Sequence, residues 1–76
     1  MKNGPMNEHI ETLEVVALTE DLPSRGLRRG QVGTVVEEAA PGVYEVEFVD
    51  AEGRTYALLT LRAEQLMPLR YAPVGA

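Results

Sequence analysis

The sequence predicts an all-β fold of five short strands, and three observations support this prediction. A chain of 76 residues forms one small domain, near the lower size limit for an independent core. Short runs rich in valine and leucine recur along it, separated by turns that contain glycine or proline. The segment from Gly26 to Gly33 places three glycines around a basic turn and leads directly into β-branched residues, as expected where a small, strongly bent sheet turns a corner.

Residues 1–12 are predicted to form a flexible leader or a short helix. Asn7 can cap a single helical turn that runs through Leu13, and Ile10 and Leu13 would then share one face. That face would cover one end of the core; alternatively, the leader would be free to dock on a partner. The first residues lack the apolar core of a signal sequence.

The first strand is predicted over Glu14–Leu18, which is short and almost wholly apolar. A long polar loop follows over Thr19–Arg29, and the second strand over Gln31–Glu38. Strict alternation would place Val32 and Val35 on opposite faces of that strand. A bulge near Gly33 and Thr34 would turn both valines inward, and this is the register we expect.

The third strand, predicted over Val43–Asp50, alternates cleanly and lies between two turns, Ala39–Gly42 and Asp50–Gly53. Its core face holds Tyr44, Val46 and Phe48, and its opposite face holds Val43, Glu45, Glu47 and Val49.

The fourth strand, Arg54–Arg62, is apolar on both faces. A single 3-10 turn is expected at Ala63–Gln65, and a last edge strand at Leu66–Leu69. Five strands, a long first loop and a helical turn before the last strand indicate a small SH3-like five-stranded barrel over residues 13–69, with residues 70–76 as a tail.

Several runs resemble a bacterial family of small proteins known as domain of unknown function 4926. These runs are Val15–Pro23, Gly26-Leu27, Gly30–Val36, Tyr44–Phe48, Gly53–Ala57 and Leu66. The resemblance implies a compact SH3-like protein without an established activity, and it suggests a toxin-like or other partner encoded nearby. Gly30, Gly33 and Val35 are also similar to the KOW-type motif of transcription and ribosomal proteins, whose faces are usually basic.

The net charge of -5, from 12 acidic and 7 basic residues, disfavours general binding to nucleic acid and suits a basic protein partner. No apolar stretch approaches the length of a membrane helix, so we expect a cytoplasmic protein. The chain has no cysteine, one histidine (His9) and one serine (Ser24), which argues against a catalytic triad. We therefore expect no enzyme activity.

Acidic side chains are numerous, but we expect them to be solvated. The pairs Glu20-Asp21, Glu37-Glu38 and Glu45/Glu47 lie at positions that predict exposure, whereas a carboxylic acid that works as a catalytic acid needs burial. The segment Asp50–Gly53 faintly resembles a calcium loop, but a turn explains it. We expect no cofactor and no metal.

Two groups of residues are candidates for binding a partner. Arg25, Arg28 and Arg29 cluster in the first loop, where they could hold an anionic ligand or an acidic patch, or pair internally with Glu20 and Asp21. Apolar residues of the strands exceed what one core can hold: Val36, Val49, Leu59 and Leu61 are left unassigned. Either the leader and Leu69 cover them, or another chain does, with Val49, Leu59 and Leu61 as anchors.

These features favour a non-enzymatic protein-interaction module, either an antitoxin- or immunity-like protein or an accessory subunit. Its partner would be another protein, steered by Glu45 and Glu47 if it is basic, or a second copy in a homodimer. The alternative is a KOW-like nucleic-acid-binding module that uses the arginine loop, with an affinity that falls steeply with salt.

Overall fold

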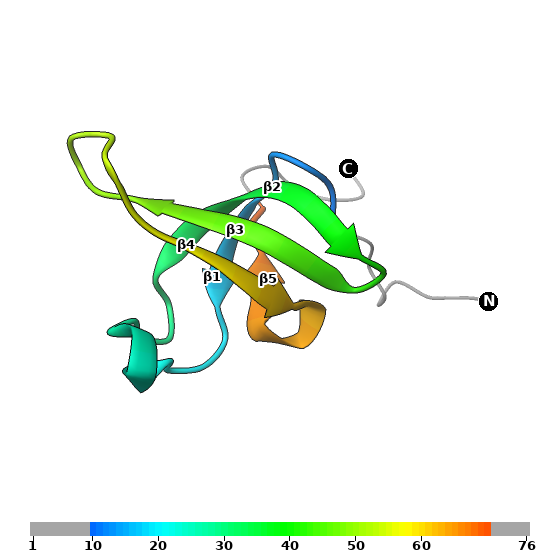
Figure 1. Cartoon of the computed structure of the whole chain (residues 1–76), viewed down its shortest axis with the longest axis horizontal. Coiled ribbons are helices and arrows are strands. Elements are labelled where there is room, and N and C mark those ends of the chain that lie inside the picture. The colour runs from blue at the N-terminus through cyan, green and yellow to red at the C-terminus, as the bar shows by residue number, and fades with distance from the viewer. Residues whose placement is uncertain (1–9, 71–76) are drawn as a thin grey trace.

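The computed structural model describes residues 10–70 and shows an all-β protein with one antiparallel sheet of five strands (Figure 1). The strands are β1 (Val15–Leu18), β2 (Val32–Ala40), β3 (Val43–Val49), β4 (Thr55–Arg62) and β5 (Leu66–Pro68). Two short 3-10 helices, η1 (Pro23–Arg25) and η2 (Ala63–Gln65), lie in the first loop and before the last strand. The predicted all-β class, five-strand count and 3-10 turn before the last strand are confirmed.

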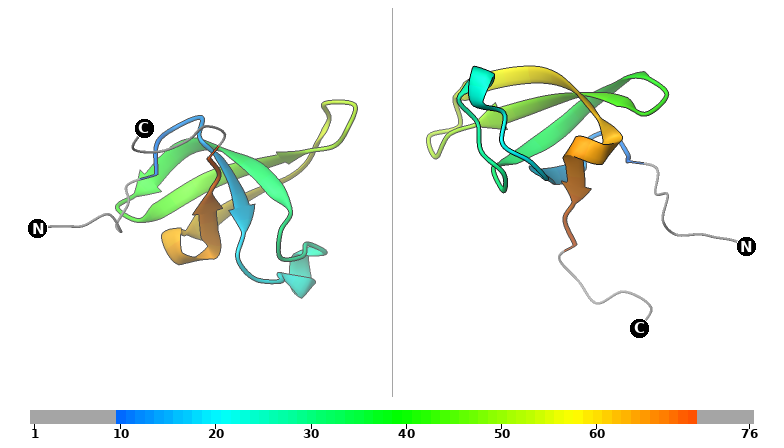
Figure 2. Two further views of the ribbon diagram at one scale, coloured as in Figure 1. Left: turned by 180° about the vertical axis from the view of Figure 1, so that it is seen from behind. Right: turned by 90° about the horizontal axis from the view of Figure 1, so that it is seen from below.

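The sheet bends sharply between its two halves. Its strand order is β4-β3-β2-β1-β5, and the views in Figure 2 show β1 and β5 beneath the broad, twisted layer of β2, β3 and β4. η2 connects β4 directly to β5, yet within residues 10–70 no ladder joins these two strands. The sheet is therefore open, with β4 at one edge and β5 at the other.

The core fills the space between the two halves of the sheet. Tyr44, Val46 and Phe48 are buried on the inner face of β3, as their alternation predicts. The four remaining strands, the segment before β1 and the first loop supply the rest of the cluster. These residues are Ile10, Val16, Leu18, Leu27, Val35, Leu59, Leu61 and Leu66. Leu59 and Leu61 thus belong to the core, and their predicted role as surface anchors is wrong.

The register of β2 also differs from the prediction. Val32 is half exposed and Val35 is fully buried, so strict alternation holds and no bulge turns both inward. The irregularities in the β2–β3 ladder come later, between Val35 and Glu37 and between Glu38 and Ala40. Gly33 pairs regularly with Val16 and needs no positive φ.

Residues 11–14 form a turn and not the last part of the helical turn that is one of the two predicted alternatives for the leader. The Glu14 N–H donates to the Glu11 carbonyl, and Leu13 has a φ of 73°. Leu13 is 73% exposed whereas Ile10 is buried, so the two do not share a face. The Leu13 N–H donates to the Val35 carbonyl, and the Val35 N–H donates to the Glu14 carbonyl. Leu13 and Glu14 thus lie opposite the single residue Val35, which is the pattern of a β-bulge whose first residue is usually glycine. The described part does not include residues 1–9 of the leader, among them Asn7, or residues 71–76 of the tail.

Both predicted hairpin turns are present. Gly42 and Gly53 have φ of 75° and 84°, the left-handed conformation that glycine adopts without strain. In the second turn, Asp50 Oδ1 accepts hydrogen bonds from the backbone N–H groups of Glu52 and Arg54, both at 2.9 Å. The side chain of this aspartate therefore organises the hairpin by holding the backbone N–H groups of the turn.

Candidate interaction face

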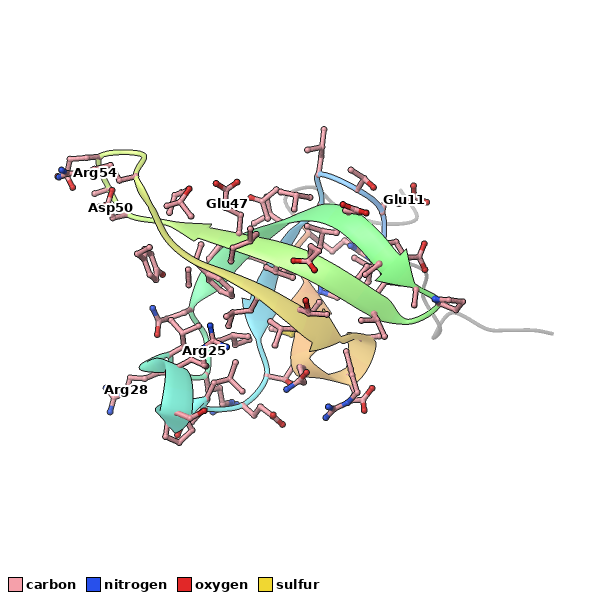
Figure 3. The ribbon with its side chains drawn as sticks, in the orientation of Figure 1. Glu11, Arg25, Arg28, Glu47, Asp50 and Arg54 are labelled. Atoms are coloured by element: carbon pink, nitrogen blue, oxygen red, sulfur yellow. The ribbon has the colours of Figure 1, made fainter. Side chains whose placement is uncertain are left out.

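The arginine loop is held in place by its one buried side chain. Leu27 packs in the core, and Leu22 and Leu27 form an isolated bridge that closes the loop around η1. Gly26, with a φ of 71°, ends η1 and donates its N–H to the Pro23 carbonyl. This arrangement presents Arg25 and Arg28 from a compact projection at the bottom of Figure 3.

The expected internal pairing of these arginines is wrong. Asp21 accepts the backbone N–H of Arg29 at 2.8 Å, and Glu20 accepts a hydrogen bond from the Gln65 side chain at 3.0 Å. Across residues 10–70, the three guanidinium groups of the loop make no ion pair.

Arg28 and Arg29, although neighbours in the sequence, line different depressions of the surface. Arg28 lines a depression with Pro23 and Leu27, whereas Arg29 lines a separate one with Leu18 and Met67. The loop therefore offers separate exposed cations rather than a pocket for one phosphate or carboxylate.

The face of the sheet that points away from the core, called the outer face below, carries a second set of exposed side chains. Cα pairing fixes which residues share it: Glu47 pairs with Thr34 on one side and Leu58 on the other, and Ala17 pairs with both Val32 and Met67. Because side chains alternate along a strand, Val32 lies on the same face as Thr34, and Val49 on the same face as Glu47.

Four large apolar side chains on the outer face are 46–57% exposed, and they reach from one sheet edge to the other. They are Leu58 of β4, Val49 of β3, Val32 of β2 and Met67 of β5, and we call them the apolar band. Leu58, Val32 and Met67 escaped the sequence-based prediction. Alternation carried through the hairpin from the Val49–Thr55 pair would place Leu58 opposite the buried Val46; the register shift between Phe48 and Val49 moves it opposite Glu47, on the outer face.

The predicted acidic residues lie on the outer face beside this band. Glu45 accepts a hydrogen bond from the Thr60 hydroxyl at 2.7 Å, and Glu47 accepts one from the Thr55 hydroxyl. Both carboxylates therefore lean from β3 toward β4, and neither makes an ion pair in the part of the chain that the structure describes. Figure 3 shows Glu47 over the sheet, away from the arginine loop. Of the predicted site residues, Val49, Glu45 and Glu47 thus lie together, while the arginines lie apart.

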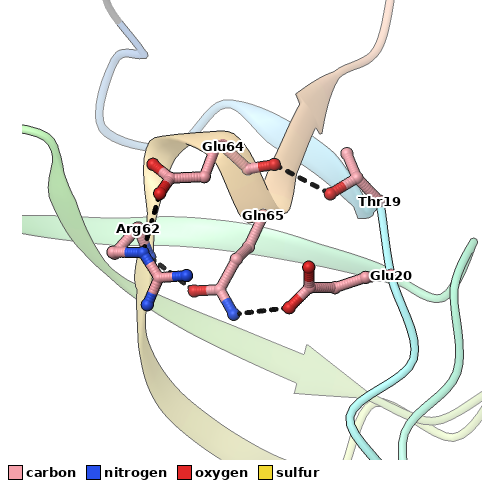
Figure 4. A network of polar contacts seen from close by, with 5 residues as sticks. All are labelled: Thr19, Glu20, Arg62, Glu64 and Gln65. Atoms are coloured by element: carbon pink, nitrogen blue, oxygen red, sulfur yellow. Dashed lines mark hydrogen bonds and ion pairs between the residues drawn. The ribbon is translucent and has the colours of Figure 1, made fainter.

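A network of polar contacts fastens η2 to the end of β1 (Figure 4). The Gln65 side chain is buried; its oxygen accepts the Arg62 backbone N–H at 2.8 Å, and its nitrogen donates to Glu20. Thr19 donates its hydroxyl to the Glu64 carbonyl at 2.8 Å. The Arg62 guanidinium donates to the Glu64 carboxylate, which lowers the pKa of Glu64 and raises that of Arg62. Because that ion pair is exposed, we assign the fastening to Gln65.

Replacing Gln65 with alanine is expected to lower the free energy of unfolding by about 1–2 kcal/mol, because it removes the acceptor of the Arg62 N–H and the donor to Glu20. Urea denaturation followed by circular dichroism measures the change. Glu20→Gln is the control, since an amide oxygen still accepts from Gln65. A Gln65→Ala variant as stable as this control would show that the network contributes nothing.

Two kinds of site are not seen in the described region. Among residues 10–70, no group of three or more histidine or acidic side chains is arranged to hold a metal ion. None of the helices in this region has the length and apolar character needed to cross a bilayer.

Comparison with known proteins shows the family of this chain. The model of a family described as "Domain of unknown function (DUF4926)" matches residues 12–68, which is three quarters of the chain. No curated protein and no solved structure matches.

Proposed function

We propose that this chain, which belongs to the domain of unknown function 4926 family, is a non-enzymatic protein-interaction module on an SH3-like barrel scaffold. In this proposal it works in the bacterial cytoplasm, as an antitoxin- or immunity-like protein or as an accessory subunit. The apolar band on the outer face is the observation that carries the proposal.

The band favours a partner protein because of its extent. Single exposed apolar residues are common, but here they occur on four of the five strands of one sheet face. The flanking carboxylates of Glu45 and Glu47 and the net charge of -5 favour a basic partner surface.

The test compares capture of a partner by the native chain and by variants of the band. Tagged protein is used to recover partners from nuclease-treated native lysate, and the bound proteins are identified by mass spectrometry. We expect one stoichiometric protein that Val32→Asp and Leu58→Asp lose, because a buried carboxylate in the interface is costly. Leu13→Asp is the matched control, since Leu13 is even more exposed but precedes the sheet. If Val32→Asp and Leu58→Asp captured the same protein as the native chain does, the proposal would be contradicted.

A KOW-like nucleic-acid-binding function is the second candidate, supported by the guanidinium groups of Arg25, Arg28 and Arg29, which make no ion pair among residues 10–70. Fluorescence anisotropy with labelled single-stranded and duplex RNA tests it. Binding that weakens steeply with salt and is lost when all three arginines become alanine would support this function. No binding at low salt would exclude it.

A further inference from the structure

The edge of the sheet formed by β4 has backbone groups that pair with no group among residues 10–70. The Ala63 N–H donates to the Gly42 carbonyl, so Ala63 turns its backbone toward the β3 side. Backbone direction alternates along an antiparallel strand, so Leu61, Leu59 and Ala57 also face β3. Leu58 and Thr60 consequently direct their N–H and C=O groups away from the sheet. The next outward N–H, that of Arg62, is already bonded to the Gln65 side chain.

The two edges of the sheet differ in how well they are protected against a further strand. β5 has three residues and includes Pro68, both features that discourage strand pairing. β4 has eight residues, and from Thr55 to Leu61 it contains no charge, proline or glycine. β4 is therefore the edge at which a strand can be added.

The charge beside this edge is negative. Thr60 and Thr55 hold the carboxylates of Glu45 and Glu47 over β4, with Leu58 between them on the outer face. The arginines that flank β4 are already in ion pairs: Arg54 with Asp50 and Glu52, and Arg62 with Glu64. Beside this edge, the carboxylates of Glu45 and Glu47 thus remain without an ion pair among residues 10–70.

We propose that β4 binds an extended segment of a basic partner protein as a sixth strand of the sheet. This inference rests on the proposed function and specifies its partner. The segment bonds to the N–H and C=O groups of Leu58 and Thr60 and places an apolar side chain against Leu58. Lysine or arginine two residues before and after that side chain reaches Glu45 and Glu47, because alternate residues share a face.

A second copy of the chain fits this edge less well than a basic segment. Two β4 strands paired edge to edge would bring two sets of Glu45 and Glu47 to one junction, between chains that each carry a charge of -5. Like charges in such positions oppose strand pairing.

The probe is a seven-residue peptide in which threonine alternates with lysine, valine and lysine, with both ends blocked. It is titrated into ¹⁵N-labelled full-length protein, and amide shifts and hydrogen exchange are followed by NMR at low salt. We expect the Leu58 and Thr60 amides to exchange quickly in the free protein and to become protected by the peptide. No binding, or binding without protection of these two amides, would overturn the proposal.

Three variants test the role of the edge and of its charge. Leu58→Pro removes an outward N–H that β3 does not use, and should abolish binding. Should that variant not fold, Glu45→Gln with Glu47→Gln keeps acceptors for both threonines and should weaken peptide binding about three- to tenfold. Glu11→Gln with Asp21→Asn is the control for net charge, because it also removes two negative charges: Glu11 lies in the turn before β1 (Figure 3), and an amide at position 21 would still accept from the Arg29 N–H in the first loop. Equal affinity of the variant at Glu45 and Glu47 and this control would overturn the charge pairing.

The remaining outcomes separate this inference from the proposed function. Protection of Leu58 and Thr60 in the free protein that rises with concentration, together with a dimer in sedimentation velocity, would assign the edge to a second copy and overturn the proposal. A peptide that fails to bind, while a partner is still captured and lost in Val32→Asp, would remove the sixth strand but leave the interaction module standing.

Discussion

Replacing Gly33 with alanine is expected to lower the free energy of unfolding by about 2–3 kcal/mol, although the substitution adds only one methyl group. A Cβ at this position would lie 2.8 Å from Val46 Cγ1, 3.0 Å from the Glu47 carbonyl oxygen and 3.0 Å from Phe48 Cε2. The carbonyl belongs to a strand paired on both sides, and Phe48 is fully buried. None of these atoms can yield without disturbing the core, so the methyl group strains the β2–β3 ladder.

Gly26→Ala separates this steric effect from the conformational one. Gly26 has a φ of 71° and open space where a Cβ would lie, so alanine there should cost only the left-handed conformation, about 1–2 kcal/mol. Urea denaturation of both variants gives the comparison. If the Gly33→Ala variant were as stable as the Gly26→Ala variant, the core would yield more easily than the distances suggest.

The sequence located Gly33 correctly but gave the wrong reason for it. A glycine next to threonine and valine in a strand is compatible with a bulge or with a close approach of another chain segment. Only the position of Phe48, 15 residues later in the sequence, decides between them. The alternation of β3 and the two turns that flank it, which depend on one segment alone, are confirmed.

Contacts with residues distant in the sequence also explain the wrong predictions around β1. The composition before Leu13 permits a helical turn, but the hydrogen bond from Leu13 to Val35 in β2 favours a bulge instead. Likewise, Glu20 and Asp21 are close to the arginines in sequence, yet Glu20 is bonded to Gln65, 45 residues away. Long-range partners of this kind leave no local signal.

For the candidate site, the sequence indicates a surplus of apolar strand residues, but the prediction places the exposed residues of β4 on the wrong side of that strand. Both faces of this strand carry leucine, so residue type alone does not distinguish core from surface. Pairing with β3 does: Leu59 lies opposite the buried Val46, and Leu58 opposite Glu47. The exposed set therefore includes Leu58 instead of Leu59 and Leu61.

Leu59→Ala and Leu58→Ala test this assignment directly, because the two leucines are neighbours on one strand. Leu59 is 4% exposed within the core cluster, so its truncation leaves a cavity and should cost about 2–4 kcal/mol. Leu58 is 57% exposed, and its truncation should change stability by less than about 0.5 kcal/mol. Denaturant midpoints of the two variants and the native chain provide the measurement.

The destabilisation expected for Leu59→Ala is large for this protein, because a domain of 76 residues has a total stability of only about 4–11 kcal/mol. Leu59→Ala is therefore expected to unfold at a much lower temperature than the native chain, and to lose partner binding through loss of structure. Leu58→Ala should stay folded and weaken binding of the basic peptide through lost contact alone. Similar stability losses in both variants would mean that another part of the protein covers Leu58, and the apolar band would then lose its member on β4.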